Sequence, residues 1–182
     1  MTSLRKQAAQ LPVDEPSVEE GWQELLQRGL KSKTALLNSE AFMSAADAGQ
    51  LLGIGEPAIR RRLREGNLFA LKASGDGEYR IPVWALDAKV AGQATARLLQ
   101  DAQGTDEWWL YHFMTTPNGS LNGLCPFECL LSPENDPWVK KRARKELVAN
   151  LELPVNASLV EPVRQALKSE LEESAAAQGR QT

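Results

Sequence analysis

Few residues in this chain are suited to covalent or metal chemistry. Its 182 residues include two cysteines and one histidine, His112, which has no acid or second histidine at ligand or triad spacing. Cys125 and Cys129 lie four positions apart, so we expect reduced thiols and no disulfide framework. The sequence contains no P-loop, no G-x-S-x-G motif and no carboxylate pair in an apolar context. The sequence therefore predicts that the protein is not an enzyme and has no metal or cofactor site. It also predicts a structural role for His112.

Long apolar runs are also missing. No segment approaches the roughly 18 consecutive apolar residues that span a bilayer, and the N-terminus has no apolar stretch typical of a signal peptide. These absences predict a cytoplasmic protein with no membrane partner. The 21 basic and 24 acidic residues give a formal net charge of −3, which provides no overall attraction to nucleic acid. Any nucleic-acid surface must therefore be local.

Turn residues and apolar periodicity predict a mainly α fold with one small β-hairpin. The length allows one sizeable core or two small ones, and two compact motif regions favour two small subdomains. The predicted segments are a flexible tail (1–16), N-terminal helices (17–42), a first functional unit (43–87), a connector helix (88–104), a helical unit (105–153), and a C-terminal helix and tail (154–182).

The first predicted helix begins at Ser17 and ends at Gly29. Ser17 and Glu20 have capping-box spacing, and the apolar side chains recur at helical spacing. They form a stripe of Val18, Trp22, Leu25 and Leu26. We expect this stripe to cover the neighbouring unit, with partner binding as the alternative, and a further helical turn or two over Thr34 to Phe42.

The unit over residues 43–87 begins with two short helices. Ser44 is a predicted N-cap, and the helix that follows runs to about Leu52, with an inner face of Ala45, Ala48, Leu51 and Leu52. A Gly-Ile-Gly turn then leads to a second helix that Pro57 opens and Gly66 ends. After it, residues 68–72 and 78–81 alternate like the two strands of a hairpin.

The second of these helices is crowded with arginine. Residues placed at 100° intervals put Ile59 and Leu63 toward the core and the arginines on the outer face and flanks. No acid lies between Ile59 and Leu63, so mutual repulsion of the arginines would be relieved by phosphates. This helix is therefore the first candidate nucleic-acid contact.

This run resembles the winged helix-turn-helix of the excisionase and MerR-type DNA-binding families. The family pattern S-x-x-x-A-A-x-x-L-G-V-S, a basic second helix, G-x-L and a wing ending R-I-P is matched by Ser44, Ala48, Leu52-Gly53-Ile54, Gly66-Asn67-Leu68 and Arg80-Ile81-Pro82. The resemblance implies that the second helix enters the major groove and that the wing lies on the flanking backbone. It implies DNA contacts from Arg60, Arg61, Arg62, Arg64, Lys72, Tyr79 and Arg80.

The chain departs from that pattern at Gly55-Glu56-Pro57, where the families usually have a Ser or Thr N-cap. A carboxylate at this position would repel a phosphate at the start of the helix. An alternative interpretation is that the winged unit serves only as a protein-binding scaffold.

The helical unit over residues 105–153 carries a second motif. Thr105 is the predicted cap of a dense apolar helix, and a turn cluster separates this helix from a short one that Pro126 opens. The pattern W-L, then P-N-x-x-L-x-G-x-x-P-x-x-x-L resembles the C-terminal domain of the Xre/MbcA/ParS antitoxin family. It is matched by Trp109-Leu110, Pro117-Asn118, Leu121, Gly123, Pro126 and Leu130.

The second resemblance implies a small helical domain that dimerises and binds a partner toxin, commonly a RES-type enzyme that consumes NAD. The implied partner and dimer contacts are Trp108, Trp109, Pro117, Asn118, Leu121, Gly123, Pro126 and Leu130. The family's usual N-terminal domain is an all-helical Xre-type domain, whereas this chain has the winged pattern there.

A basic run follows in the predicted helix that Asp136 caps and Pro137 opens. Its cations make a second candidate DNA surface, for which we single out Lys140, Lys141 and Arg144; a solvated helix face is the alternative. The last predicted helix, over residues 161–177, is interpreted as an oligomer or partner-binding helix.

The residues and both resemblances predict a sequence-specific DNA-binding protein that acts as a dimer, either an antitoxin-like autorepressor or a transcription regulator. The expected partners are double-stranded DNA, a second copy of the chain and, for an antitoxin, a RES-type toxin. Two alternatives stay open. One is an architectural or accessory protein of excision or plasmid partition that oligomerises along DNA, which the basic run favours. The other is a toxin-neutralising interaction module that does not bind DNA.

Overall fold

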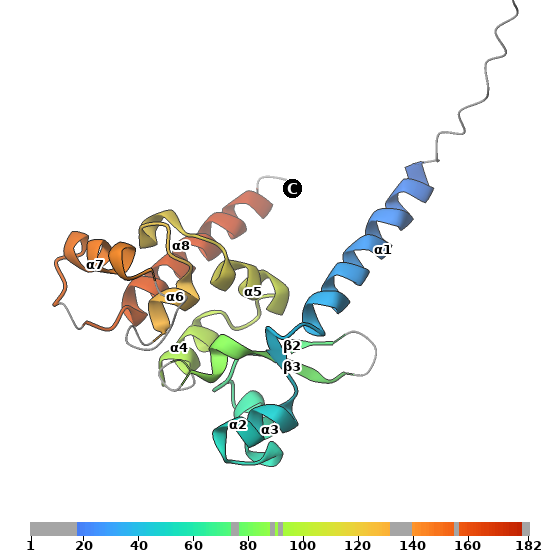
Figure 1. Cartoon of the computed structure of the whole chain (residues 1–182). Helices are drawn as coiled ribbons and strands as arrows, with labels where there is room; N and C mark the ends of the chain where they lie inside the picture. Colours follow the sequence, from blue (N-terminus) through green and yellow to red (C-terminus); the bar gives the residue numbers. More distant parts are fainter. Residues whose placement is uncertain are drawn as a thin grey trace, which may run out of the picture.

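A computed structural model describes residues 18–73, 77–87, 90, 93–131, 140–154 and 157–179. Its architecture is mainly helical with one small antiparallel sheet, as predicted (Figure 1). The predicted tail over residues 1–16, the hairpin turn at residues 74–76 and the start of the basic helix at Asp136 and Pro137 lie outside the described residues. None of the helices in the described part of the chain has both the length and the apolar composition needed to cross a bilayer.

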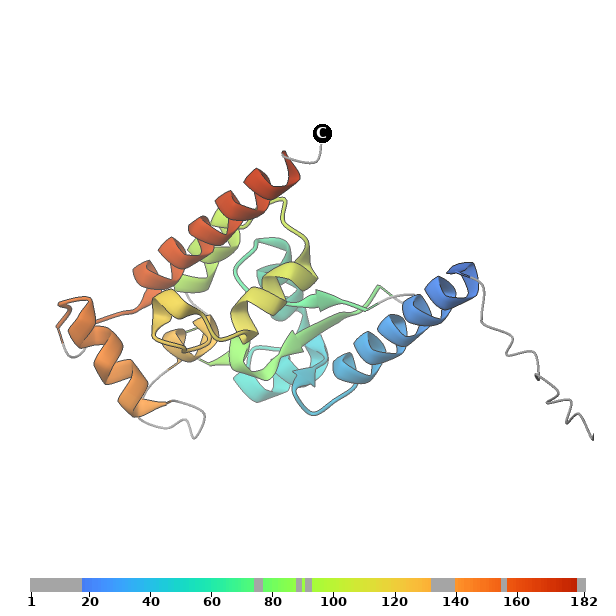
Figure 2. The ribbon, with the colours of Figure 1, turned by 90° about the horizontal axis from the view of Figure 1, so that it is seen from above.

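Helix α1 (Val18–Leu37) is a single helix of 20 residues that projects away from the rest of the molecule (Figures 1 and 2). The predicted end at Gly29 is wrong, because one glycine inside a helix costs only about 1 kcal/mol relative to alanine. The prediction that its apolar stripe packs against the neighbouring unit is also wrong. The side chains of Trp22, Leu25, Leu26 and Leu30 are 55–60% exposed.

Helices α2 (Ala45–Leu52) and α3 (Glu56–Arg64) form the predicted pair of short helices. Ser44 caps α2, because its side-chain oxygen accepts a hydrogen bond from the backbone N of Asp47 at 3.1 Å. Gly49 permits the close approach of the pair, since a Cβ atom there would lie 2.6 Å from the backbone carbon of Gly55. Leu51, predicted to face inward, is instead 60% exposed.

The sheet has three strands in the order β1-β3-β2: β1 (Phe42–Met43), β2 (Leu71–Lys72) and β3 (Tyr79–Pro82). β2 and β3 form the predicted hairpin, with Leu71 opposite Arg80. β1 was not predicted, because two residues are too few to show strand alternation. Of the helical turns expected over Thr34 to Phe42, residues 34–37 are helical as the end of α1, whereas Phe42 lies in β1. β1 adds an edge strand with Phe42 opposite Pro82.

The remaining elements are helical. They are η1 (Val83–Leu86), α4 (Gln93–Asp101), α5 (Glu107–Thr115), η2 (Gly119–Leu121), α6 (Pro126–Leu130), α7 (Lys141–Asn150) and α8 (Val160–Gln178). Asp106, not the predicted Thr105, caps α5: its carboxylate accepts hydrogen bonds from the backbone N of Trp108 and of Trp109, both at 3.0 Å. Helix α8 packs on α4, α6 and η2, and its Val163 and Leu167 are fully buried.

A single cluster of buried side chains runs from the sheet region into the C-terminal helices. Trp84 of η1 lies at the junction. Its ring stacks on Phe69 and on Phe127, with centroids 5.6 Å apart in each case. The sheet region and the C-terminal helices are therefore joined by aromatic packing.

An ion pair ties α8 to α4. The guanidinium of Arg164 binds the carboxylate of Asp101 with two hydrogen bonds, Nε to Oδ2 at 2.6 Å and Nη2 to Oδ1 at 3.2 Å. Both side chains are about four-fifths buried, with exposed fractions of 21% and 19%. The hydrogen bond from Arg164 holds the pKa of Asp101 below its ordinary value of 3.8.

The variant Asp101→Asn should lower the melting temperature at neutral pH by about 3 °C, because it removes a charge-assisted pair. The folded-state pKa is lowered, so the stabilisation is complete above pH 3.8 and is lost as the pH falls through the lower, folded pKa. Thermal unfolding followed between neutral pH and about pH 3 should show the two proteins converging in acid. Glu161→Gln, which changes the exposed second acceptor of Arg164, should have little effect. A pH-independent difference for Asp101→Asn would contradict the electrostatic explanation.

Candidate functional site

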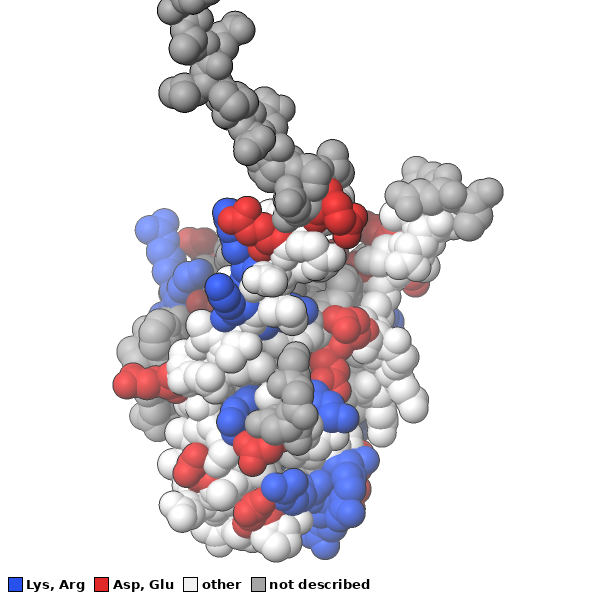
Figure 3. All heavy atoms as spheres, turned by 90° about the vertical axis from the view of Figure 1, so that its right-hand side faces the viewer, with Lys and Arg blue, Asp and Glu red and all other residues white. Residues whose placement is uncertain are grey.

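The arginines of α3 lie on the outside of the molecule. Pro57 is tolerated in the first turn, and the burial of Ile59 fixes which face of α3 packs inward. Arg60, Arg61 and Arg64 are exposed and Arg62 is half-buried. Figure 3 shows Lys and Arg side chains gathered at the lower end of the molecule, the end that α2 and α3 form in Figure 1.

Two of these arginines have acidic partners that flank the run. Arg60 Nε lies 2.6 Å from Glu56 Oε1, and Arg61 Nε lies 3.9 Å from Glu65 Oε1. Repulsion along α3 is therefore weaker than the run Ile59 to Leu63 alone suggests. Arg62 and Arg64 form no ion pair with any residue that the structure describes. Exposed pairs contribute only about 0–1 kcal/mol, so phosphates can replace these carboxylates at small cost.

The hairpin supplies further cations. Helix α2 packs against both α3 and β3, so the hairpin and the arginine helix flank it. Lys72 is exposed, and the backbone N of Lys72 donates to Glu107 Oε2 at 3.2 Å. Arg80 is only 22% exposed and pairs with Glu78 at 2.8 Å, while Tyr79 packs against the core. Of the hairpin residues predicted to contact DNA, Lys72 is thus the most accessible.

The basic run of α7 is used mainly within the chain. Arg144 Nη1 donates to the backbone oxygens of Glu128 and Cys129, at 3.3 and 2.8 Å, and burial lowers the pKa of Arg144. Lys140 Nζ lies 3.6 Å from the carboxylate of Glu128, which is itself buried. Lys140 and Arg144 therefore both contact oxygen atoms of α6. Of the DNA contacts predicted in the basic run, only Lys141 is exposed and has no such partner among the described residues.

The predicted partner and dimer contacts separate into buried and accessible residues. Leu121, Pro126 and Leu130 are core residues, and Gly123 has a φ of +73° in an exposed turn. Trp109 is half-buried and stacks on Phe113, with centroids 6.0 Å apart. The accessible members also include Trp108, Pro117 and Asn118. The motif therefore builds the turn and its core, and only part of it reaches the surface.

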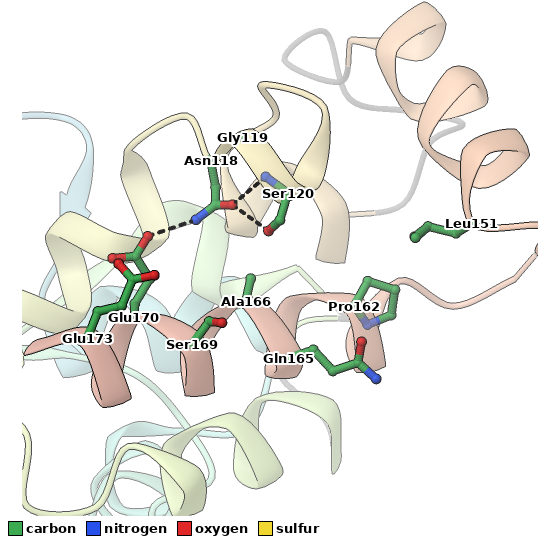
Figure 4. Close-up of a pocket in the computed structure, with 10 residues that line it drawn as sticks. All are labelled: Asn118, Gly119, Ser120, Leu151, Pro162, Gln165, Ala166, Ser169, Glu170 and Glu173. Atoms are coloured by element: carbon green, nitrogen blue, oxygen red, sulfur yellow. Dashed lines mark hydrogen bonds between the residues drawn. The ribbon is translucent and has the colours of Figure 1, made fainter. Parts of the chain in front are cut away.

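Asn118 holds this turn together. Its side-chain oxygen accepts hydrogen bonds from the backbone N and the hydroxyl of Ser120, at 2.9 and 2.6 Å, and its backbone N donates to Leu124. Its amide nitrogen donates to Glu170 on α8 at 3.2 Å. Figure 4 shows this side chain reaching from the turn toward α8.

A groove runs between this turn and α8. One pocket of about 430 Å³ is lined by Asn118, Ser120, Pro162, Ser169 and Glu173, among others (Figure 4). A smaller pocket of about 130 Å³, lined by Trp109 and Pro117, shares Asn118 and Glu170 with the first. Helix α8 was predicted to bind a second copy or a partner, but its place beside the Asn118 turn was not, because its apolar period indicates a helix but not its neighbours.

A second, more apolar groove of about 750 Å³ lies between η1 and α6, lined by Leu51, Val83, Trp84, Phe127 and Leu131, among others. Trp84 Nε1 is buried and has no hydrogen-bond partner among the described residues. No sequence motif indicated this groove, because residues from distant segments form it.

The site offers little for covalent chemistry. Cys125 and Cys129 are free and buried, and burial raises the pKa of Cys129 to about 12, which keeps it a neutral thiol. His112 is exposed, and its Nδ1 lies 3.2 Å from the hydroxyl of Thr116. No group of three His, Cys, Asp or Glu side chains in the described ranges is placed to hold a metal ion.

No protein-family model matches the chain, and neither a search of curated proteins nor a search of solved structures finds a match. The two family resemblances therefore depend on the quoted motifs alone. The exposed arginines of α3 and the groove beside α8 are the two surface features described above that suit binding.

Proposed function

We propose that this protein is a sequence-specific DNA-binding protein and acts as an antitoxin-like autorepressor or transcription regulator. In this proposal α2, α3 and the β2–β3 hairpin are a winged helix-turn-helix. Helix α3 enters the major groove, and the hairpin lies on the flanking phosphates.

The observation that supports this most directly is the outer face of α3. This nine-residue helix carries four arginines, while the whole chain has a net charge of −3. Arg61 and Arg64 are exposed on the face opposite the core and are long enough to reach base edges. The carboxylates beside Arg60 and Arg61 make only exposed pairs, which DNA phosphates can replace.

The basic run of α7 is a weaker candidate for DNA contact. Because Lys140 and Arg144 are engaged with α6, an assembly protein that uses α7 as a second DNA surface is less well supported than a regulator with one reading helix. Protection of one short operator in a footprint supports the regulator, whereas protection spreading over many phased sites supports the assembly protein.

A second proposed function is the binding of a partner protein in the groove between the Asn118 turn and α8. The two adjoining pockets that share Asn118 and Glu170 favour it, because they combine aromatic, proline and carboxylate groups on one concave surface. A toxin encoded beside this protein is the partner that the antitoxin resemblance suggests.

The double variant Arg61→Ala/Arg64→Ala should weaken specific binding to the protein's own promoter by about 100-fold, since each good base contact contributes about 1–3 kcal/mol. A gel shift at fixed salt measures this. The charge-matched control is Arg97→Ala/Lys168→Ala, which removes two exposed cations from α4 and α8. Equal affinities of the two double variants would contradict the assignment of α3.

The variant Glu56→Gln should tighten DNA binding several-fold, because it removes the negative charge from the start of α3 and releases Arg60 for a phosphate. The slope of log affinity against log salt concentration should become steeper by about one unit. Glu24→Gln is the matched control, since Glu24 makes the equivalent pair with Arg28 on α1. Unchanged or weaker binding by Glu56→Gln would show that α3 does not approach phosphates at this end.

The variant Ser169→Trp should abolish co-purification with the protein encoded by the neighbouring gene, because the indole fills the pocket beside Asn118. Lys168→Trp is the matched control, since Lys168 is the next residue on α8, is exposed and does not line the pocket. Co-purification that survives Ser169→Trp would exclude this groove as the partner site.

A further inference from the structure

The two adjoining pockets beside α8 carry charge of one sign only. Glu170 lines both pockets and Glu173 lines the larger one, whereas no lysine or arginine among the described residues lines either pocket. Figure 4 shows both carboxylates on the side of α8 that faces Asn118. Carboxylates three positions apart on a helix are neighbours and repel each other, so a bound cation would relieve this repulsion.

Both carboxylates can accept further hydrogen bonds. The Oε1 atom of Glu170 accepts the hydrogen bond from the Asn118 amide at 3.2 Å, and the Glu170 side chain is half-buried. The two oxygens of a carboxylate together accept about four hydrogen bonds, so Oε2 is left for a bound donor. Glu173 is exposed and forms no ion pair with any residue in the described ranges. These two acceptors favour a donor with a positive charge.

The smaller pocket has the size and the aromatic wall for one long side chain. Its volume of about 130 Å³ lies well below the roughly 300–1,000 Å³ of pockets that bind whole small molecules. Trp109, Phe113 and Pro117 line this pocket together with Glu170. The planar guanidinium of arginine stacks on aromatic rings and donates to a carboxylate through a fixed fork of N–H groups, whereas the ammonium of lysine is a compact point charge.

We propose that the smaller pocket binds an arginine side chain of the partner protein, with the guanidinium between the Trp109 ring and the Glu170 carboxylate. The rest of the partner's basic segment then lies along the larger pocket, where Glu173 offers a second carboxylate. Leu151 and Pro162 supply an apolar wall there. This inference rests on the proposed binding of a partner protein in the groove, and it adds that the bound segment is basic.

The probe for the pocket is N-acetyl-arginine methylamide, and its control is N-acetyl-citrulline methylamide, which has nearly the same shape without the charge. The isotope-labelled full-length chain is titrated with each probe and followed by NMR. The arginine probe should shift the indole N–H signal of Trp109 and the side-chain amide signals of Asn118 until they saturate, and the citrulline probe should shift neither. The variant Trp109→Phe identifies the indole signal. Equal responses to the two probes, or no response to arginine, overturn the proposal.

A lysine probe tests whether the pocket selects arginine or any cation. N-acetyl-lysine methylamide should bind several-fold more weakly than the arginine probe, because an ammonium lacks the planar fork that matches a carboxylate and an aromatic wall. Equal or tighter binding of the lysine probe overturns the assignment of an arginine.

The variant Glu170→Gln should weaken binding of the arginine probe at least about 10-fold, because it removes the charge that the guanidinium binds but keeps an oxygen for Asn118. Glu172→Gln is the matched control, since Glu172 is an exposed carboxylate of the same helix that lines neither pocket. Circular dichroism of both variants confirms that they are folded. Equal affinities of the two variants contradict the role of Glu170 and overturn the proposal.

Two outcomes separate this inference from the proposed function. If Ser169→Trp abolishes co-purification with the neighbouring protein but the arginine probe does not bind, the groove is a partner site and only the assignment of an arginine is wrong. If the arginine probe binds through Glu170 but no protein co-purifies with the chain, the pocket selects arginine as proposed and only the proposed partner function is contradicted.

Discussion

The stack of Phe69, Trp84 and Phe127 is the interaction on which the relation between the two halves of the molecule depends. Phe69 precedes the hairpin, Trp84 follows it, and Phe127 belongs to α6. Aromatic rings combine a large buried area with a preferred geometry, so this contact restricts rotation of one half against the other. Since the buried cluster continues on both sides, the arginine helix and the groove beside α8 belong to one packed body.

The cations of this body differ in whether they contact other groups of the chain. Some cations of α7 and α8, such as Arg144 and Arg164, serve intramolecular contacts, whereas Arg62 and Arg64 have no ion-pair partner within the described residues. A protein with net charge −3 is repelled by DNA at long range, so a small basic surface binds weakly in a single copy. For the proposed DNA-binding function, two linked copies would therefore bind more tightly than one, because the second contact is made at a higher effective concentration.

Local signals in the sequence predicted local structure well. Ser44 and Pro57 set the starts of α2 and α3, and the hairpin followed from strand alternation and a glycine-rich turn. Predictions that required knowledge of the neighbours were wrong or incomplete. Leu51 has the spacing of an inner residue but faces solvent, because Gly49 rather than Leu51 meets the turn before α3. The engagement of Arg144 with α6 could not be predicted either, because a basic helix face looks the same whether its partner is DNA or a carbonyl group.

Helix α1 and the C-terminal helices present separate surfaces. The antitoxin resemblance assigns dimerisation and partner binding to one C-terminal domain, in which Leu121 and Leu130 are core residues and only a few side chains remain accessible. Helix α1 supplies a separate apolar stripe at the far side of the body from α7 and α8 (Figure 2). A molecule bound to the stripe of α1 would therefore leave the groove beside Asn118 free.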